Sequence, residues 1–167
     1  VGYLPDEPVF YDFMRGREII RFCGEMRGLS GEIIIRRSCE LAERLQLSGA
    51  LEEFAENYSR GMKKKLGLIC AMLHDPPLLI LDEPTNGLDP HSTQVLHALM
   101  KETVAAGRTV FFSTHLLDQA ERLCDRVAIV KNGAVAAEGT LADLRAGFGQ
   151  DRSLEQLFFE LTESASA

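Results

Sequence analysis

The chain has 167 residues, a formal net charge of −7 and an isoelectric point near 5.1. This length allows one domain with a sizeable core, and 46% hydrophobic with 26% charged residues is ordinary for a soluble globular protein. The acidic charge argues against a nucleic-acid-binding surface, which needs clustered Lys and Arg to neutralise phosphates. The one run of cationic residues is Lys63–Lys65.

Cysteine spacing and hydropathy argue against a disulfide- or zinc-stabilised protein and against a membrane-spanning one. The four cysteines are widely spaced without a CxxC pair. This spacing indicates neither a disulfide framework nor a zinc site, and it fits a reducing cytoplasm. No apolar run approaches the roughly 20 residues that a helix needs to cross a bilayer. We therefore expect any membrane role to come through a partner.

The N-terminal part of the chain predicts a strand followed by two helices. Residues 1–5 read as a strand entering a turn, and Val1 in place of Met indicates that the chain starts inside a domain. Two helices are expected within residues 16–46, separated by residues 28–31. The residues expected on their apolar faces are Ile19, Phe22, Cys23 and Met26 in the first helix and Ile34, Leu41 and Leu45 in the second.

A third helix should begin near Ser59 and end before two consecutive prolines, after which the pattern changes to strand. Residues 78–81 are four aliphatics without alternation, which is typical of a strand buried on both faces of a parallel sheet. Asp82 and Glu83 then lie at its carboxyl end, where open α/β sheets bind ligands. One carboxylate could hold a hard cation while the other takes a proton from an attacking water. A buried strand that merely ends in a polar turn is the alternative that this segment alone leaves open.

The following segment predicts a β-α-β unit. Asp89 and Pro90 make a favourable helix start, as N-cap and first helical residue. Residues 109–113 read as the next strand, which should lie parallel to the first. Thr114 and His115 fall at its carboxyl end.

The chain then predicts a short helix, a hairpin and two small helices. Asn132–Gly133 is a favoured two-residue hairpin turn, so the sheet is expected to end in a hairpin. The last two helices should each begin with a capping pattern, namely Thr140-x-x-Asp143 and Ser153-x-x-Gln156.

Four segments, in their order and spacing, resemble the nucleotide-binding domain of ATP-binding cassette (ABC) ATPases. They are Tyr58–Met62, Leu78–Glu83, Gly87–Asp89 and Ser113–His115. The resemblance covers effectively the whole chain and is to the second part of such a domain. In particular, the chain is similar to the exporter branch that handles drugs, antibiotics or polysaccharides.

The resemblance implies an α/β fold, a partial P-loop NTPase (RecA-like) core with a mainly parallel sheet and an inserted α-helical subdomain. The implied organisation places the end of a core strand and the Q-loop at residues 1–8 and the helical subdomain with the signature motif at 9–75. The core with Walker B, D-loop and H-loop follows at 76–139, and the C-terminal helices and tail occupy 140–167.

Individual residues take roles from the same resemblance. Asp82 matches the Walker B aspartate, which holds Mg²⁺ mostly through water, and Glu83 matches the general base that activates the attacking water. Ser59 and Gly61 belong to the signature segment, which in the family grips the γ-phosphate of ATP held by the opposite subunit. An ordinary serine helix cap is the alternative for Ser59.

Three more residues stand at positions of the family's motifs, but each either differs from the usual residue or has a purely structural alternative. Asp89 belongs to the D-loop, which links two active sites across a dimer and is also compatible with a plain helix cap. His115 matches the switch histidine that contacts the γ-phosphate, although a lone histidine after a strand is more often structural. Asp6 stands where the Q-loop glutamine is usual, and as a carboxylate it remains a good Mg²⁺ ligand. Arg60 and Met62 replace the usual glycine and glutamine of the signature.

The phosphate-binding loop of the family is missing from the sequence. No G-x-x-x-x-G-K-[ST] pattern and no Gly-Lys dipeptide occurs, so the cradle for phosphates and its cationic Lys are expected upstream of Val1. We therefore expect this chain alone to bind ATP weakly or not at all.

The resemblance implies the ATP-binding and hydrolysing subunit of an ABC transporter that uses ATP and Mg²⁺. ATP-driven dimerisation with a second such domain would power export through a transmembrane permease, at the cytoplasmic face of the cell membrane and without a nucleic-acid partner. Phe10, Tyr11 and Phe13 would meet the permease or, alternatively, pack in the core. Two other readings remain: a non-catalytic module that lends its signature to an intact partner, and a non-transport ABC ATPase.

Overall fold

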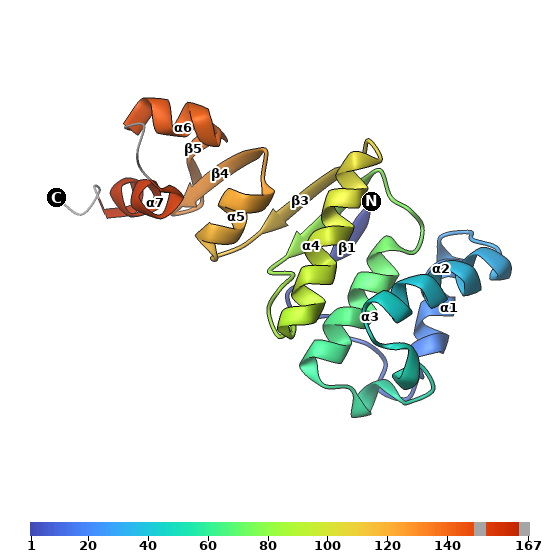
Figure 1. The fold of residues 1–167 in the computed structure, drawn as a ribbon. Coiled ribbons are helices and arrows are strands. Elements are labelled where there is room, and N and C mark those ends of the chain that lie inside the picture. Colours follow the sequence, from blue (N-terminus) through green and yellow to red (C-terminus); the bar gives the residue numbers. More distant parts are fainter. Residues whose placement is uncertain (149–152, 164–167) are drawn as a thin grey trace. The chain divides into compact units, whose positions relative to one another are not determined.

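A computed structural model describes residues 1–148 and 153–163 of the chain (Figure 1). Packing divides the chain into two compact units, Val1–Ser113 and Thr114–Ala167, and each unit is described by itself.

The first unit contains a parallel sheet and most of the helices. Its elements are β1 (Gly2–Leu4), α1 (Gly16–Met26), α2 (Gly31–Arg44), the short 3₁₀ helices η1 (Ser48–Ala50) and η2 (Ala55–Asn57), α3 (Arg60–Met72), β2 (Leu78–Asp82), α4 (Pro90–Ala105) and β3 (Thr109–Ser113). All of the helices and strands predicted for this part of the chain are present.

The sheet of the first unit has the order β1-β2-β3, and both pairs of strands are parallel. Leu81 of β2 pairs with Leu4 of β1 and with Phe112 of β3, and Asp82 pairs with Ser113. The predicted β-α-β unit is therefore confirmed. Its two strands end side by side, so Asp82 and Ser113 lie together at one edge of the sheet.

The two faces of this sheet are covered unequally, which corrects one prediction. Leu79 and Leu81 are each 1% exposed, whereas Phe111 of the neighbouring strand is 61% exposed and Tyr3 of β1 is 56% exposed. Helix α3 packs against β1 and α4 against β3, and the described helices bury the face that carries Leu79. The run 78–81 was predicted to be buried on both faces, but among the described residues Leu78 and Ile80 on the other face are only half-buried. An aliphatic run does not reveal which face is covered.

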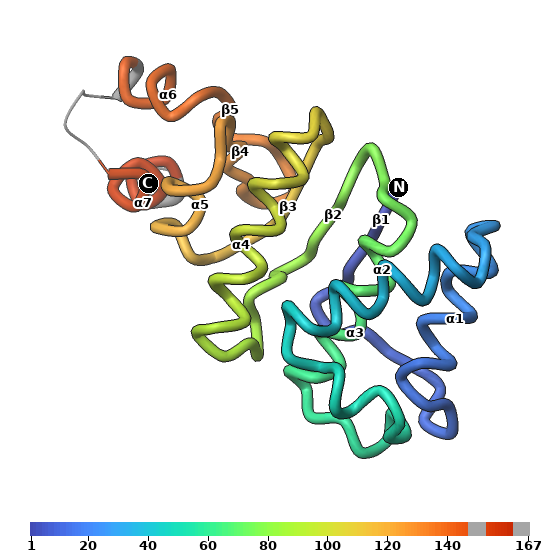
Figure 2. The backbone as a smooth tube through the Cα atoms, turned by 45° about the vertical axis from the view of Figure 1, so that its right-hand side comes forward, coloured from blue at the N-terminus to red at the C-terminus, as the bar shows by residue number. Residues whose placement is uncertain are grey.

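Helices α1, α2 and α3 pack on one another beside the sheet (Figure 2). The predicted buried face of α2 is confirmed, but that of α1 is partly wrong: Phe22 is 49% and Met26 71% exposed. Gly24 explains the difference, since a Cβ at this position would lie 2.5 Å from Cγ1 of Ile34 in α2. The contact between the two helices is therefore centred on a glycine, not on the bulky residues.

An apolar group lies exposed in the loop between β1 and α1. Val9, Tyr11 and Phe13 are 89%, 62% and 76% exposed, and the rings of Tyr11 and Phe13 lie 5.7 Å apart. Core packing, one of the two predicted uses of this cluster, is thus wrong for Tyr11 and Phe13.

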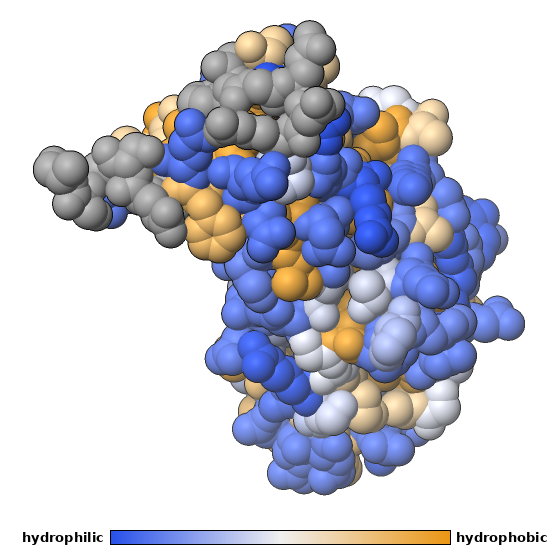
Figure 3. All heavy atoms as spheres, turned by 60° about the vertical axis from the view of Figure 1, so that its left-hand side comes forward, coloured by the Kyte–Doolittle hydropathy of each residue, from blue (hydrophilic) through white to orange (hydrophobic). Residues whose placement is uncertain are grey.

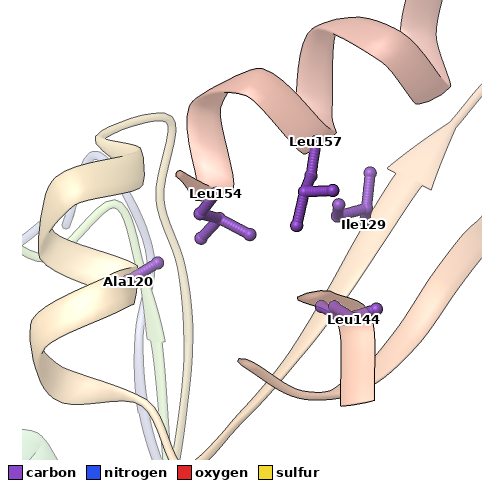
Figure 4. Packing of buried hydrophobic residues seen from close by; sticks show 5 residues of the cluster. All are labelled: Ala120, Ile129, Leu144, Leu154 and Leu157. Carbon is purple, nitrogen blue, oxygen red and sulfur yellow. The ribbon is translucent and has the colours of Figure 1, made fainter. Parts of the chain in front are cut away.

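The second unit consists of a hairpin and three helices. Its described elements are α5 (Leu117–Leu123), β4 (Arg126–Lys131), β5 (Ala134–Thr140), α6 (Leu141–Phe148) and α7 (Leu154–Glu163). A core cluster joins them (Figure 4), formed by Ala120, Ile129, Leu144, Leu154 and Leu157. Both predicted capping patterns are present as reciprocal hydrogen bonds at the starts of α6 and α7.

The hairpin turn was predicted correctly, but its place in the sheet was not. Asn132 and Gly133 both have positive φ, 50° and 77°, as a two-residue turn between twisted strands requires. β4 and β5 form an antiparallel sheet of their own and do not extend the sheet that contains β3. The reason is that this hairpin packs its apolar face on α5, α6 and α7 of its own unit.

Hydrophilic side chains cover most of the face drawn in Figure 3. Among the described helices, none combines the length and the apolar character that a membrane span requires.

Candidate active site

Asp82 is the last residue of β2, and the neighbouring strand holds its side chain. Ser113, its partner in the ladder, donates a hydrogen bond from Oγ to Asp82 Oδ1 at 2.5 Å. The same Oγ accepts a hydrogen bond from the backbone N–H of Glu83 at 3.1 Å. A serine that both donates and accepts in this way fixes the carboxylate and the first peptide of the following turn.

Glu83 begins the turn in an uncommon backbone conformation. Its φ is +42°, in the left-handed region that costs a residue with a side chain free energy and that concentrates at functional sites. The backbone N–H of Asn86 donates to the Glu83 carbonyl oxygen at 3.1 Å, and the intervening Pro84 is buried. The chain thus leaves the sheet sharply, at the carboxyl end of a parallel strand, where such sheets bind ligands.

The N-terminus of α3 carries the signature-like residues. Ser59 is the N-cap of this helix, and its Oγ accepts a hydrogen bond from the backbone N–H of Met62 at 3.2 Å. The predicted helix cap is therefore present, and Ser59 itself is exposed. The positive end of a helix dipole and the N–H groups of the first turn favour an anion at such a position.

Gly61 allows this helix N-terminus to approach the turn that follows β2. A Cβ at Gly61 would lie 2.6 Å from the carbonyl oxygen of Gly87, a distance that real contacts do not permit. Gly87 has a φ of +77°, which glycine adopts at low cost. These two glycines therefore bring the signature-like segment and the D-loop-like turn together within one chain.

Asp89 caps α4 and is paired with a lysine from α3. Its Oδ1 accepts from the backbone N–H of Ser92 at 2.8 Å and its Oδ2 from the Ser92 hydroxyl at 2.6 Å. Lys65 places Nζ 3.0 Å from the same Oδ2. The hydrogen bonds from Ser92, followed by the Lys65 cation, hold the pKa of Asp89 well below its ordinary value.

Asp6 lies in the loop after β1 and is tied to the end of β2. Its Oδ1 accepts hydrogen bonds from Lys64 Nζ and from Asn86 Nδ2, each at 3.2 Å, and Arg60 Nη2 lies 3.8 Å away. The Asn86 hydrogen bond, together with the Lys64 ammonium, lowers the pKa of Asp6. Burial lowers the pKa of Lys64, and Asp6 opposes that effect.

The carboxylate of Asp82, held by Ser113, suits a divalent cation of the Mg²⁺ type. In residues 1–148 and 153–163 no group of three His, Cys, Asp or Glu side chains could form a complete protein cage for a metal. Mg²⁺ does not need one, because it is usually held by one or two carboxylates, with phosphate oxygens and water completing the shell. The fixed carboxylate of Asp82 is a hard oxygen ligand of this kind.

The described contacts connect most of the predicted site residues. Five of them lie in the first unit, namely Asp6, Ser59, Gly61, Asp82 and Asp89. Lys64 of α3 binds the segments of Asp6 and Asp82, Lys65 of α3 pairs with Asp89, and Gly61 lies against Gly87.

His115 is exposed and belongs to the second unit. The turn beside it is fixed by Thr114, whose Oγ1 accepts from the backbone N–H of Leu116 at 3.0 Å.

Sequence reasoning missed four residues that organise the site, which are Lys64, Lys65, Asn86 and Ser113. A signal for one of them was present. Lys64 shares a helix face with Gly67, Leu68 and Ala71, at the spacing i, i+3, i+4 and i+7. A lysine on the apolar face of a helix is rarely buried without a charged partner, and a partner could have been sought among the nearby carboxylates.

Comparisons with known proteins place these features in a family. Residues 32–117 match the family model described as "AAA domain, putative AbiEii toxin, Type IV TA system". The ABC-type transporter ATP-binding protein EcsA of Bacillus subtilis is 40% identical over 162 residues, 96% of this chain and 66% of EcsA. The daunorubicin/doxorubicin resistance ATP-binding protein DrrA of Streptomyces peucetius is 36% identical, over 83% of this chain and 42% of DrrA.

A solved structure agrees with these relatives. The ATP binding subunit of an ABC transporter superimposes with a TM-score of 0.92 at 41% identity, over 96% of this chain and 67% of that chain. The chain spans from 42% to 66% of the length of the curated relatives that it matches. The sequence identity and the fold agree, and the chain belongs to the family of ABC transporter ATP-binding proteins.

Proposed function

We propose that the protein containing this chain binds and hydrolyses ATP as the ATP-binding subunit of an ABC transporter. One observation carries the proposal: Asp82, fixed by Ser113 at the carboxyl end of a parallel strand, is followed at once by Glu83 in a left-handed turn. This arrangement puts a cation ligand and a second carboxylate on consecutive residues at the end of the strand. Family membership supplies the reaction class, phosphoryl transfer to water.

Each carboxylate has a separate role in this proposal. Asp82 holds Mg²⁺, directly or through water, and Asp6 contributes a second carboxylate from the loop after β1. The metal ion supplies charge neutralisation at the phosphates. Glu83 accepts a proton from the attacking water as general base, and His115 contacts the γ-phosphate. Catalysis then depends on positioning, which the hydrogen bonds of Ser113 support.

The signature-like residues act in trans in this proposal. Ser59 and Gly61, at the N-terminus of α3, bind the γ-phosphate of ATP held by a second ATP-binding domain. Asp89 and its turn lie in contact with the same segment through Gly87 and Lys65, which suits a link between two sites. ATP would thus draw two such domains together.

Export through a membrane permease is the proposed use of this cycle. The names of DrrA and of the linearmycin resistance protein LnrL of Bacillus subtilis, 34% identical over 155 residues, refer to drug resistance. The exposed group of Val9, Tyr11 and Phe13 offers an apolar surface of the kind that protein partners cover. We propose that the permease binds there, at the cytoplasmic face of the membrane.

Asp82→Asn in the full-length protein tests the metal assignment. We expect the variant to hydrolyse ATP at least about 100-fold more slowly at low Mg²⁺, because its neutral amide holds the cation less well. Hydrolysis would be followed by phosphate release across a Mg²⁺ titration. Asp125→Asn, at an exposed position before β4, is the matched control. Equal rates for the two variants at every Mg²⁺ concentration would refute the proposal.

A further inference from the structure

Lys64 is buried beside the candidate active site, with its side chain 1% exposed. Its Nζ lies within hydrogen-bonding distance of four oxygen atoms. These are the carbonyl oxygens of Asp6 at 2.7 Å, Asp82 at 3.3 Å and Pro5 at 3.4 Å, and Asp6 Oδ1 at 3.2 Å. All four atoms are hydrogen-bond acceptors, so the nitrogen is an ammonium whose three N–H groups the four oxygens share.

The oxygens that Lys64 binds belong to the loop after β1 and to the last residue of β2. Asp6 follows β1 by two residues, and Asp82 ends β2. β1 and β2 are neighbours in the sheet, with Leu4 paired to Leu81. Lys64 reaches both segments from α3, the helix whose N-terminus carries Ser59. A single side chain therefore joins the signature helix to the loop after β1 and to the carboxyl end of β2.

The neighbouring lysine shows that this burial is specific. Lys63 lies 3.9 Å from Asp12 in an ion pair, and its side chain is 31% exposed. A buried ammonium is costly unless hydrogen bonds and an opposite charge compensate it. Lys64 meets that requirement through Asp6, and Asn86 donates to the same carboxylate oxygen.

We propose that Lys64 is a positioning residue for ATP hydrolysis, which rests on the function proposed above. It holds the Asp6 loop against the carboxyl end of β2, and so fixes the distance between Asp6 and the Asp82–Glu83 segment. Lys64 does not touch the nucleotide; it acts through these two segments. Without its ammonium, Asp6 loses its main counter-ion and the two segments are free to separate.

Lys64→Met and Lys63→Met in the full-length protein form a matched pair for the test. We expect Lys64→Met to lower kcat at least about tenfold and to raise the Mg²⁺ concentration for half-maximal rate severalfold, because small misplacements of reacting groups are costly. Lys63→Met should stay within about twofold of the wild type, as expected for an exposed pair.

A double-mutant cycle with Asp6→Asn separates positioning from packing. If Lys64 acts through Asp6, the loss caused by Lys64→Met should be clearly smaller when Asp6→Asn is already present. A variant that keeps some donor capacity, Lys64→Gln, should fall between the wild type and Lys64→Met and serves if the latter does not fold. A lower Tm for Lys64→Met with unchanged kcat and Mg²⁺ dependence would overturn the proposal.

Hydrogen exchange gives a readout that does not depend on hydrolysis. In Lys64→Met the backbone amides of Glu83 and Asn86, which donate hydrogen bonds in the wild type, should exchange faster, whereas in Lys63→Met they should match the wild type. Unchanged protection in both variants would overturn the positioning role. If the wild type shows the expected protection pattern but does not hydrolyse ATP, the proposed function fails and the structural tie by Lys64 stands.

Discussion

The two units of the chain bury different kinds of side chain. The first unit encloses charge, since Lys64 and Lys65 are 1% and 9% exposed and reach the carboxylates of Asp6 and Asp89. Among the described residues of the second unit, the buried side chains are apolar and form a single cluster (Figure 4). The first unit therefore uses part of its interior to position polar groups, and the second uses its interior for packing.

This difference separates two kinds of mutational effect. Substitutions in the apolar cluster of the second unit should reduce stability, because burial is what that cluster contributes. Substitutions around the end of β2 should reduce hydrolysis more than stability, because buried polar groups there fix the geometry of neighbouring loops.

The largest expected change in stability comes from the second unit. Leu154→Ala removes a side chain that is 1% exposed, and leucine truncation in a core costs about 2–5 kcal/mol of unfolding free energy. Leu116→Ala, at a position 36% exposed, is the matched control and should cost less than about 1 kcal/mol. Denaturant unfolding of the full-length protein measures both. Equal losses would mean that the cluster does not form the core of this unit.

Gly61→Ala tests the close approach in the first unit. The added methyl would meet the Gly87 carbonyl oxygen at 2.6 Å, and we expect a cost of about 1–3 kcal/mol with a loss of hydrolysis. Gly31→Ala, at the first residue of α2 with no atom within 4 Å of the new Cβ, should be neutral or stabilising by up to about 1 kcal/mol. Thermal unfolding and phosphate release compare the two, and similar behaviour would contradict the account.

Ser113→Ala should slow hydrolysis and also lower stability modestly. It removes the donor to Asp82 Oδ1 and the acceptor of the Glu83 N–H, and a charge-assisted hydrogen bond of this kind is worth about 1.5 kcal/mol, or roughly tenfold in rate. Thr109→Ala, at the exposed opposite end of the same strand, is the control. A Ser113→Ala variant as active as this control would show that Asp82 needs no support.

The smallest expected effect concerns pH. The pKa of Asp89 is lowered from its ordinary value of 3.8, so its ionised form stabilises the fold at neutral pH and this stabilisation is lost as the pH falls through the folded pKa. Asp89→Asn keeps a good N-cap but loses the ion pair with Lys65, worth about 0.2–1 kcal/mol. The difference from wild type should be full above about pH 5 and shrink below it. A difference that stays constant down to pH 2 would contradict this assignment.

Local patterns allowed much of the fold to be predicted. The helix start at Asp89–Pro90, the turn at Asn132–Gly133 and the pattern at Thr140 are each confirmed. Each depends on residues a few positions apart, whose hydrogen bonds form within one turn. The position of Asp82 was predicted for a similar reason, since the aliphatic run ends at a definite residue.

Contacts between distant segments were not predictable in the same way. The tie from Lys64 to Asp6 joins residues 58 positions apart, and the approach of Gly61 to Gly87 depends on how a helix packs against a turn. The exposure of Phe22 follows from the small size of Gly24 on the adjoining helix face. Such features are set by tertiary packing, which neither hydropathy nor spacing within one element contains.

The central claim is that Glu83 acts on the attacking water. Glu83→Gln in the full-length protein tests it most directly, by following a single turnover of bound ATP at saturating Mg²⁺, with Glu43→Gln on the exposed face of α2 as control. The account predicts that Glu83→Gln retains ATP and favours the ATP-dependent dimer, while the hydrolysis step slows at least about 100-fold. A single-turnover rate equal to that of the control would contradict it.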